Sequence, residues 1–106
     1  MKTITYNKLV RDKIPHIIEQ AGKTCVYETL SDEQYIQMLN EKLLEEVKEY
    51  LESGTVEELA DIVEVMHAIL AFKDVSIEEF QKIRLDKLNA RGGFLDKILL
   101  KEVIEK

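Results

Sequence analysis

The scarcity of helix breakers is the feature that most constrains the fold of this chain. Its 106 residues include one proline, Pro15, and four glycines. Between Gly22 and Gly92 the only glycine is Gly54, so two long stretches contain nothing that would interrupt a helix. The sequence therefore predicts an all-α fold made of long helices.

Signals at helix ends divide the chain into four predicted helices. Residues 8–20 read as the first, although Pro15 weakens it because a proline inside a helix removes a hydrogen bond. Ser31 and Gln34 form a capping-box pattern that opens the second helix, which ends at residues 53–54. The same pattern opens helices at Thr55, with Glu58, and at Ser76, with Glu79; these helices run to about Lys73 and to Arg91. Residues 1–6 and 24–30 look extended. Residues 94–106 could form either a strand or a short helix.

The two middle helices are predicted to pair. About two residues connect them, so they must form an antiparallel hairpin. The second, residues 55–73, is apolar on nearly all sides and needs more partners than a chain of this length supplies. We therefore expect a single domain, residues 1–106, that forms a helical bundle as a homo-oligomer, either a dimer or a tetramer.

Composition and charge exclude several classes of protein. A net charge of −6 argues against nucleic-acid binding. The longest uncharged run, residues 65–72, is too short for a membrane span, and the first ten residues lack the apolar stretch of a signal peptide. The single cysteine, Cys25, excludes an internal disulfide and a cysteine-built zinc site. These features predict a reduced, cytoplasmic protein without a membrane partner.

Acidic residues concentrate on the predicted hairpin. Between Glu41 and Glu64 there are nine acidic and two basic residues, a net charge of −7. With Val47 taken as the centre of the apolar face of the first helix, Glu46 and Glu49 fall on one flank of that face. Glu58 falls only about 40° from the centre of the apolar face of the second helix.

These positions predict a metal site. An ionised carboxylate on a buried face is costly unless a cation or a donor meets it. Four carboxylates facing one another repel, and a hard divalent cation, Mg²⁺ or alternatively Mn²⁺, relieves that repulsion. The predicted ligands are Glu46, Glu49, Glu58 and Asp61. The alternative is a solvated acidic face on which Glu58 only caps its own helix through the Thr55 amide.

Three separated motifs carry a resemblance to a known family. Glu45-Glu46-Val47-Lys48-Glu49 followed by Glu58-Leu59-Ala60-Asp61 resembles the EExxE…ExxD motif of the all-α nucleoside triphosphate pyrophosphohydrolases, the MazG-like superfamily. The opening YNKLVRDKIP, residues 6–15, and the closing RGGF, residues 91–94, resemble a subgroup of small phosphoribosyl-ATP pyrophosphohydrolase-like proteins. Together the motifs span most of the chain in the same order.

The resemblance implies an oligomeric all-α bundle in which the acidic motif holds Mg²⁺ against a nucleotide triphosphate. Water then attacks at the α–β linkage and releases a monophosphate and pyrophosphate, either to clear unwanted nucleotides or to process phosphoribosyl-ATP. The resemblance assigns metal binding to Glu46, Glu49, Glu58 and Asp61. Either Glu45 or Glu49 is expected to accept the proton of the water as the general base. Basic residues in or beside the motifs suit substrate phosphates: Lys8, Arg11, Lys13 and Arg91. The alternative function is a non-catalytic helical oligomer that binds nucleotide or a protein partner.

Overall fold

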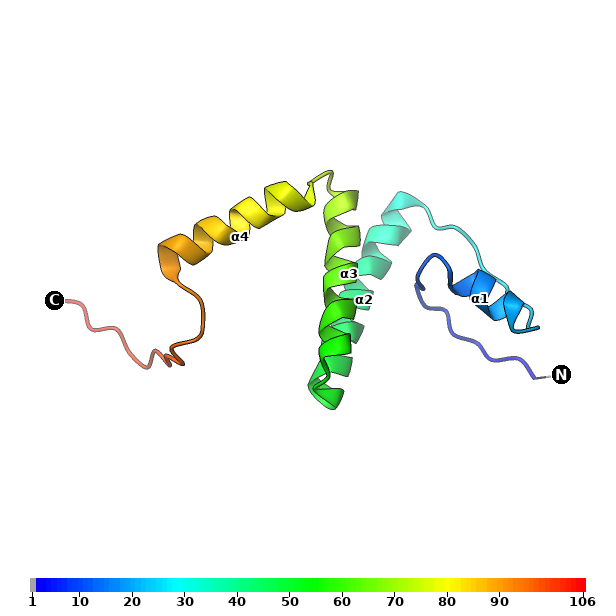
Figure 1. Ribbon diagram of the computed structural model, residues 1–106, viewed down its shortest axis with the longest axis horizontal. Coiled ribbons are helices and arrows are strands. Elements are labelled where there is room, and N and C mark those ends of the chain that lie inside the picture. The colour runs from blue at the N-terminus through cyan, green and yellow to red at the C-terminus, as the bar shows by residue number, and fades with distance from the viewer. Residues whose placement is uncertain (1) are drawn as a thin grey trace. The chain divides into compact units, whose positions relative to one another are not determined.

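The computed structural model describes residues 2–106, and this part of the chain contains four α-helices and no strand (Figure 1). The helices are α1 (Ile14–Gln20), α2 (Asp32–Ser53), α3 (Val56–Phe72) and α4 (Ile77–Arg91). The all-α prediction is confirmed. Residues 24–30 form no strand, and residues 94–106 form neither of the two alternatives left open for them. None of the helices in the described part is both long and apolar enough to pass through a lipid bilayer.

The chain divides into two compact units, Met1–Asp74 and Val75–Lys106. The first contains α1, α2 and α3, and the second contains α4 and the segment that follows it. That the whole of residues 1–106 acts as one domain stays a prediction.

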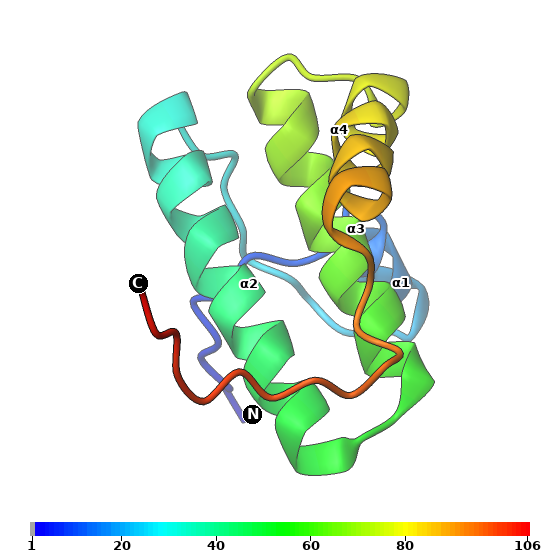
Figure 2. The same cartoon turned by 90° about the vertical axis from the view of Figure 1, so that its left-hand side faces the viewer.

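Helices α2 and α3 pack side by side and run antiparallel in the first unit (Figures 1 and 2). Gly54 ends α2 with a φ of 68°, a left-handed conformation that glycine adopts without steric cost. At the other end of α2, the predicted capping box is present: the Gln34 amide donates to the Ser31 hydroxyl, and the Gln34 side chain accepts from the Ser31 amide. These two ends fix the length of α2 and place α3 directly after it.

The first helix was predicted over residues 8–20, and its predicted first residue is wrong. α1 begins at Ile14, which puts Pro15 in the first helical turn. A proline is tolerated there because the amide that it lacks would have no partner within the helix. Asn7 has a φ of 47°, so the chain turns before Lys8, and residues 8–13 run outside any helix.

The buried face of α2 differs from the predicted one. Leu39 and Glu46 are the buried residues of this helix, with 2% and 7% of their surface exposed. They are seven residues apart and therefore lie on one face. Val47, the expected centre of the apolar face, is 37% exposed. The prediction that placed Glu46 on the flank of the buried face is therefore wrong: Glu46 lies within it.

Candidate metal centre

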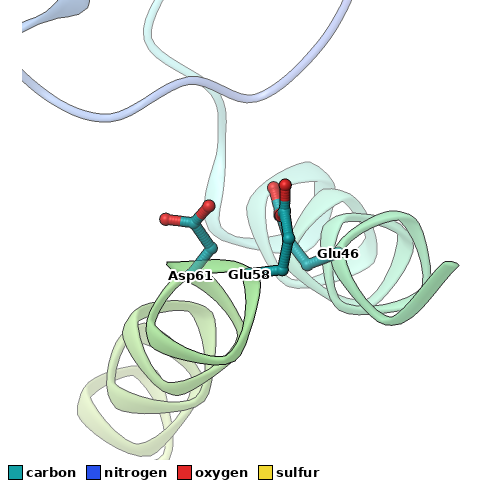
Figure 3. Close-up of side chains that lie close together, drawn as sticks. All are labelled: Glu46, Glu58 and Asp61. Carbon is teal, nitrogen blue, oxygen red and sulfur yellow. The ribbon is translucent and has the colours of Figure 1, made fainter. Parts of the chain in front are cut away.

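Three carboxylates from two helices converge in the first unit. Glu46 of α2 and Glu58 and Asp61 of α3 each offer an oxygen atom, and these atoms lie within 4.8 Å of one another. Figure 3 shows the three side chains projecting to the same side of the α2–α3 pair. Glu58 and Asp61 share a face of α3 because they are three residues apart. The pairing of α2 with α3 then brings Glu46 to them.

Two oxygens of this group are buried without a hydrogen-bond partner. They are Oε2 of Glu46 and Oε2 of Glu58. A buried acceptor that lacks a partner costs about 1–3 kcal/mol, and more when it is charged. Two such atoms beside a third carboxylate are therefore the kind of site at which a cation would stabilise the fold.

Glu58 is not the capping residue that the alternative interpretation requires. The Thr55 amide donates to the Ser53 hydroxyl at 3.3 Å, and Thr55 makes no side-chain cap. The capping-box prediction at Thr55 is therefore wrong. Because the amide that Glu58 would have satisfied already has a partner, the Glu58 carboxylate is free to face Glu46 and Asp61.

Burial and repulsion together perturb the two orphaned carboxyl groups. Burial is the largest cause that raises the pKa of Glu46, and the negative charge of Glu49 adds to it. For Glu58, burial again leads, followed by the charges of Glu49 and Asp61, and its pKa is also raised. Both groups therefore hold a proton more tightly than an ordinary glutamate, and a divalent cation would compete with that proton.

Glu45 has a different environment, because two lysines surround it. Lys8 Nζ lies 3.1 Å from Glu45 Oε1, and Lys42 Nζ lies 3.3 Å from Glu45 Oε2. The hydrogen bond from Lys8 is the largest cause that lowers the pKa of Glu45, and it also raises the pKa of Lys8. An ion-paired carboxylate with a lowered pKa accepts a proton poorly, so this environment disfavours Glu45 as a general base.

Lys42 also belongs to the site, although it is not among the site residues predicted from the sequence. Its half-buried side chain also approaches Glu46 Oε1, at 3.6 Å, so it bridges two carboxylates of the motif. The signal was present, because a lysine three and four residues before two glutamates lies on their face of a helix. Lys42 supplies a fixed positive charge at one edge of the centre.

A second basic side chain reaches the centre, from the N-terminal segment. Arg11 Nη2 lies 2.6 Å from Asp61 Oδ1, across 50 residues of sequence. Both side chains are partly exposed, 58% for Arg11 and 39% for Asp61. Two of the four predicted phosphate-binding residues, Lys8 and Arg11, therefore lie at the acidic motif.

The remaining predicted site residues lie outside the group of three carboxylates. Glu49 is not one of the converging ligands, although its charge raises the pKa of both Glu46 and Glu58. Lys13 precedes α1 and makes no ion pair within residues 2–106. Arg91 ends α4 in the second unit. The structure thus brings together three of the four predicted metal ligands and two of the four predicted phosphate-binding residues.

Comparisons with known proteins do not show a family. No family model and no solved structure matches the chain. A protein of Mycolicibacterium smegmatis (strain ATCC 700084 / mc(2)155), described as an uncharacterized protein, is 48% identical over 48 residues. The match covers 45% of this chain and 49% of that protein, so it spans about half the length of the relative.

Proposed function

We propose that this protein hydrolyses a nucleotide triphosphate at the α–β linkage, with a divalent cation, and releases a monophosphate and pyrophosphate. The observation that carries the proposal is the convergence of Glu46, Glu58 and Asp61 with two buried oxygens that have no partner. The substrate class, a nucleotide for clearance or phosphoribosyl-ATP, comes from the resemblance of the three motifs to the MazG-like superfamily.

The donor set fits Mg²⁺ or Mn²⁺. All three converging side chains offer carboxylate oxygens, and no histidine or cysteine belongs to the group. Hard cations prefer such ligands, and Mg²⁺ keeps part of its coordination shell for water and substrate phosphates. Glu49 completes the proposed set of four ligands. A cation held there would polarise phosphoryl oxygens and make water more acidic.

The basic side chains of the site suit a polyphosphate. Lys8 and Arg11 form ion pairs with carboxylates of the motif. Arg11 can bind a phosphate with two parallel hydrogen bonds, whereas Lys8 acts as a point charge. We propose that both bind the triphosphate and orient its α-phosphorus toward the carboxylates. For Lys13 and Arg91 the same role rests on the resemblance of their motifs alone.

The proposed reaction needs no covalent intermediate. The oxygen of water bonds to the α-phosphorus, the bond from phosphorus to the bridging oxygen breaks, and pyrophosphate leaves with that oxygen. One proton of the water passes to a carboxylate. The two candidate acceptors are Glu45, which Lys8 and Lys42 contact and whose pKa is lowered, and Glu49, which is also a proposed ligand.

Product analysis tests this function. A panel of nucleoside triphosphates and phosphoribosyl-ATP is incubated with Mg²⁺ in ¹⁸O water, and the products are analysed by mass spectrometry. We expect pyrophosphate and a labelled monophosphate. Label found only in pyrophosphate would place the attack at the β-phosphorus, and orthophosphate as the sole inorganic product would refute the assignment.

Variants connect the reaction to the site. Glu58→Gln removes a proposed ligand and should lower kcat by about 10²–10⁴, which corresponds to several kcal/mol of transition-state stabilisation. Lys13→Ala or Arg91→Ala should mainly raise KM. Glu52→Gln is the matched control, because Glu52 is an exposed carboxylate of α2 that forms no ion pair within residues 2–106. Hydrolysis that survives Glu58→Gln unchanged would exclude the acidic centre.

We further propose that the protein is a homo-oligomer built on the outer faces of α2 and α3. Leu39 is the only buried apolar residue in the described part of the chain, residues 2–106. Both helices instead carry exposed apolar side chains at helical spacing, with 37–75% of their surface exposed: Leu44, Val47 and Leu51 on α2, and Val56, Leu59 and Val63 on α3. A second copy offers the same apolar stripes, so pairing two α2–α3 units would bury both sets in a helical bundle.

A further inference from the structure

The N-terminal segment, residues 8–13, is attached to the acidic centre by charge. It forms no helix or strand, and α1, which follows it, does not pack against α2 or α3. Lys8 reaches Glu45 of α2 and Arg11 reaches Asp61 of α3, so the segment bridges both helices. Figure 3 shows the three carboxylates projecting to the side on which a stretch of the N-terminal part of the chain passes.

The contact with Asp61 is the informative one, because Asp61 belongs to the converging group. Arg11 Nη2 lies 2.6 Å from Oδ1 of this carboxylate. A divalent cation at the centre would draw on the same carboxylate and would repel the guanidinium beside it. Arg11 and the cation therefore compete for Asp61.

We propose that residues 8–11 form a strap that a divalent cation releases: Arg11 neutralises Asp61 in the metal-free protein, and cation binding displaces Arg11 and makes its guanidinium available to substrate phosphate. This inference rests on the proposed function, because it takes Glu46, Glu58 and Asp61 as the cation ligands. It adds an order of events, in which the cation binds before Arg11 engages the phosphates.

The size of the effect follows from the exposure of the pair. Exposed ion pairs are weak because water and salt screen them. With 58% and 39% of the two side chains exposed, the Arg11–Asp61 pair should weaken cation binding by about two- to five-fold. By linkage, the cation loosens the strap by the same factor.

Calorimetric titration of the full chain with Mn²⁺ alone, without nucleotide, measures the competition. Arg11→Gln should tighten Mn²⁺ binding about two- to five-fold. Lys13→Gln is the matched control, because it removes the same charge from the same segment at a residue that forms no ion pair within residues 2–106. It should change the Mn²⁺ affinity by less than about two-fold, the share left to long-range charge.

Hydrogen exchange of the segment gives a second readout that does not depend on activity. In the wild type, Mn²⁺ should speed amide exchange in residues 8–13, and adding triphosphate should slow it again as Arg11 binds the phosphates. In Arg11→Gln the segment should exchange fast with and without Mn²⁺.

The outcomes separate this inference from the proposed function. If the wild type and Arg11→Gln bind Mn²⁺ with the same affinity, or if Mn²⁺ slows exchange in residues 8–13, the strap is refuted while the metal centre stands. If neither protein binds Mn²⁺, the metal centre itself is refuted, and the strap with it.

Discussion

Replacing Glu46 with glutamine tests the candidate metal centre most directly. The Glu46 side chain is 9% exposed, its Oε2 atom has no partner, and Lys42 lies 3.6 Å from its Oε1 atom. Glutamine keeps the volume, removes the buried charge, and supplies an N–H that can donate to a neighbouring carboxylate. Lys42 keeps its shorter contact with Glu45, at 3.3 Å, so little pairing is lost.

The structure predicts opposite effects without and with a cation. Without it, Glu46→Gln relieves an unsatisfied buried acceptor, so the free energy of unfolding should rise by about 1 kcal/mol and Tm by about 4–8 °C. With Mn²⁺ at about 100 times its Kd, the wild type should gain about 2.7 kcal/mol. Loss of one ligand should weaken binding by at least about 10–100-fold and leave the variant a gain of about 0.4–1.4 kcal/mol. The order of the two Tm values should therefore reverse.

Thermal unfolding followed by circular dichroism at one fixed protein concentration measures both effects. Glu52→Gln, the exposed carboxylate of the same helix, should behave as the wild type does in both conditions. A Glu46→Gln protein that is less stable without metal and gains as much from Mn²⁺ as the wild type would refute the reasoning. Glu46 would then be a structural partner of Lys42 and not a ligand.

Three further predictions concern pH, assembly and packing. Without divalent cations, Tm should rise as the pH is lowered from 7.5 toward 4.5. The raised pKa values of Glu46 and Glu58 make the native state bind more protons than the unfolded chain does. Saturating Mn²⁺ should reverse the slope of Tm against pH, and a metal-free Tm that does not change with pH would contradict the prediction. The pairing of Glu45 with Lys8, which lowers the pKa of Glu45, is lost only below the ordinary value of 4.5 and leaves that window unchanged. Sedimentation at micromolar concentration should show an oligomer that Leu44→Lys together with Leu51→Lys dissociates, whereas a folded wild-type monomer would exclude the proposed interface. Leu39→Ala should lower the free energy of unfolding by about 2–5 kcal/mol, whereas Val26→Ala, at a position 98% exposed and outside the proposed interface, should change it little when urea titrations are compared.

Local signals in the sequence were sufficient to place α2, α3 and α4. The capping box at Ser31, the cap at Ser76 and the glycine at position 54 are short-range patterns, and each marks an observed helix end. They act through hydrogen bonds and backbone preferences within a few residues, so neighbouring residues contain all the information. The start of α1 was misplaced because Pro15 was treated as lying inside the helix, whereas it occupies the first helical turn, the position that proline prefers.

The three residues of the acidic centre were also predicted from the sequence. Glu58 and Asp61 lie three residues apart on one helix, and the short link at residues 54–55 brings α2 beside α3. Glu46 could be placed near them, but not within the buried face. Helix α2 carries apolar residues on more than one face, so periodicity alone did not decide whether Leu39 and Glu46 or Leu44 and Val47 pack against α3.

Two ion pairs of the site were decided only by tertiary structure. Lys8 and Arg11 reach carboxylates that lie 37 and 50 residues away in sequence. No local pattern encodes these long-range ion pairs, because they depend on where the chain returns after the turn at Asn7 and on which faces of α2 and α3 meet. The sequence by itself determined where α2, α3 and α4 begin and end and which acids they carry, since those are matters of local hydrogen bonding and spacing. Packing determined which of the acidic side chains are buried together and which basic side chains form ion pairs with them.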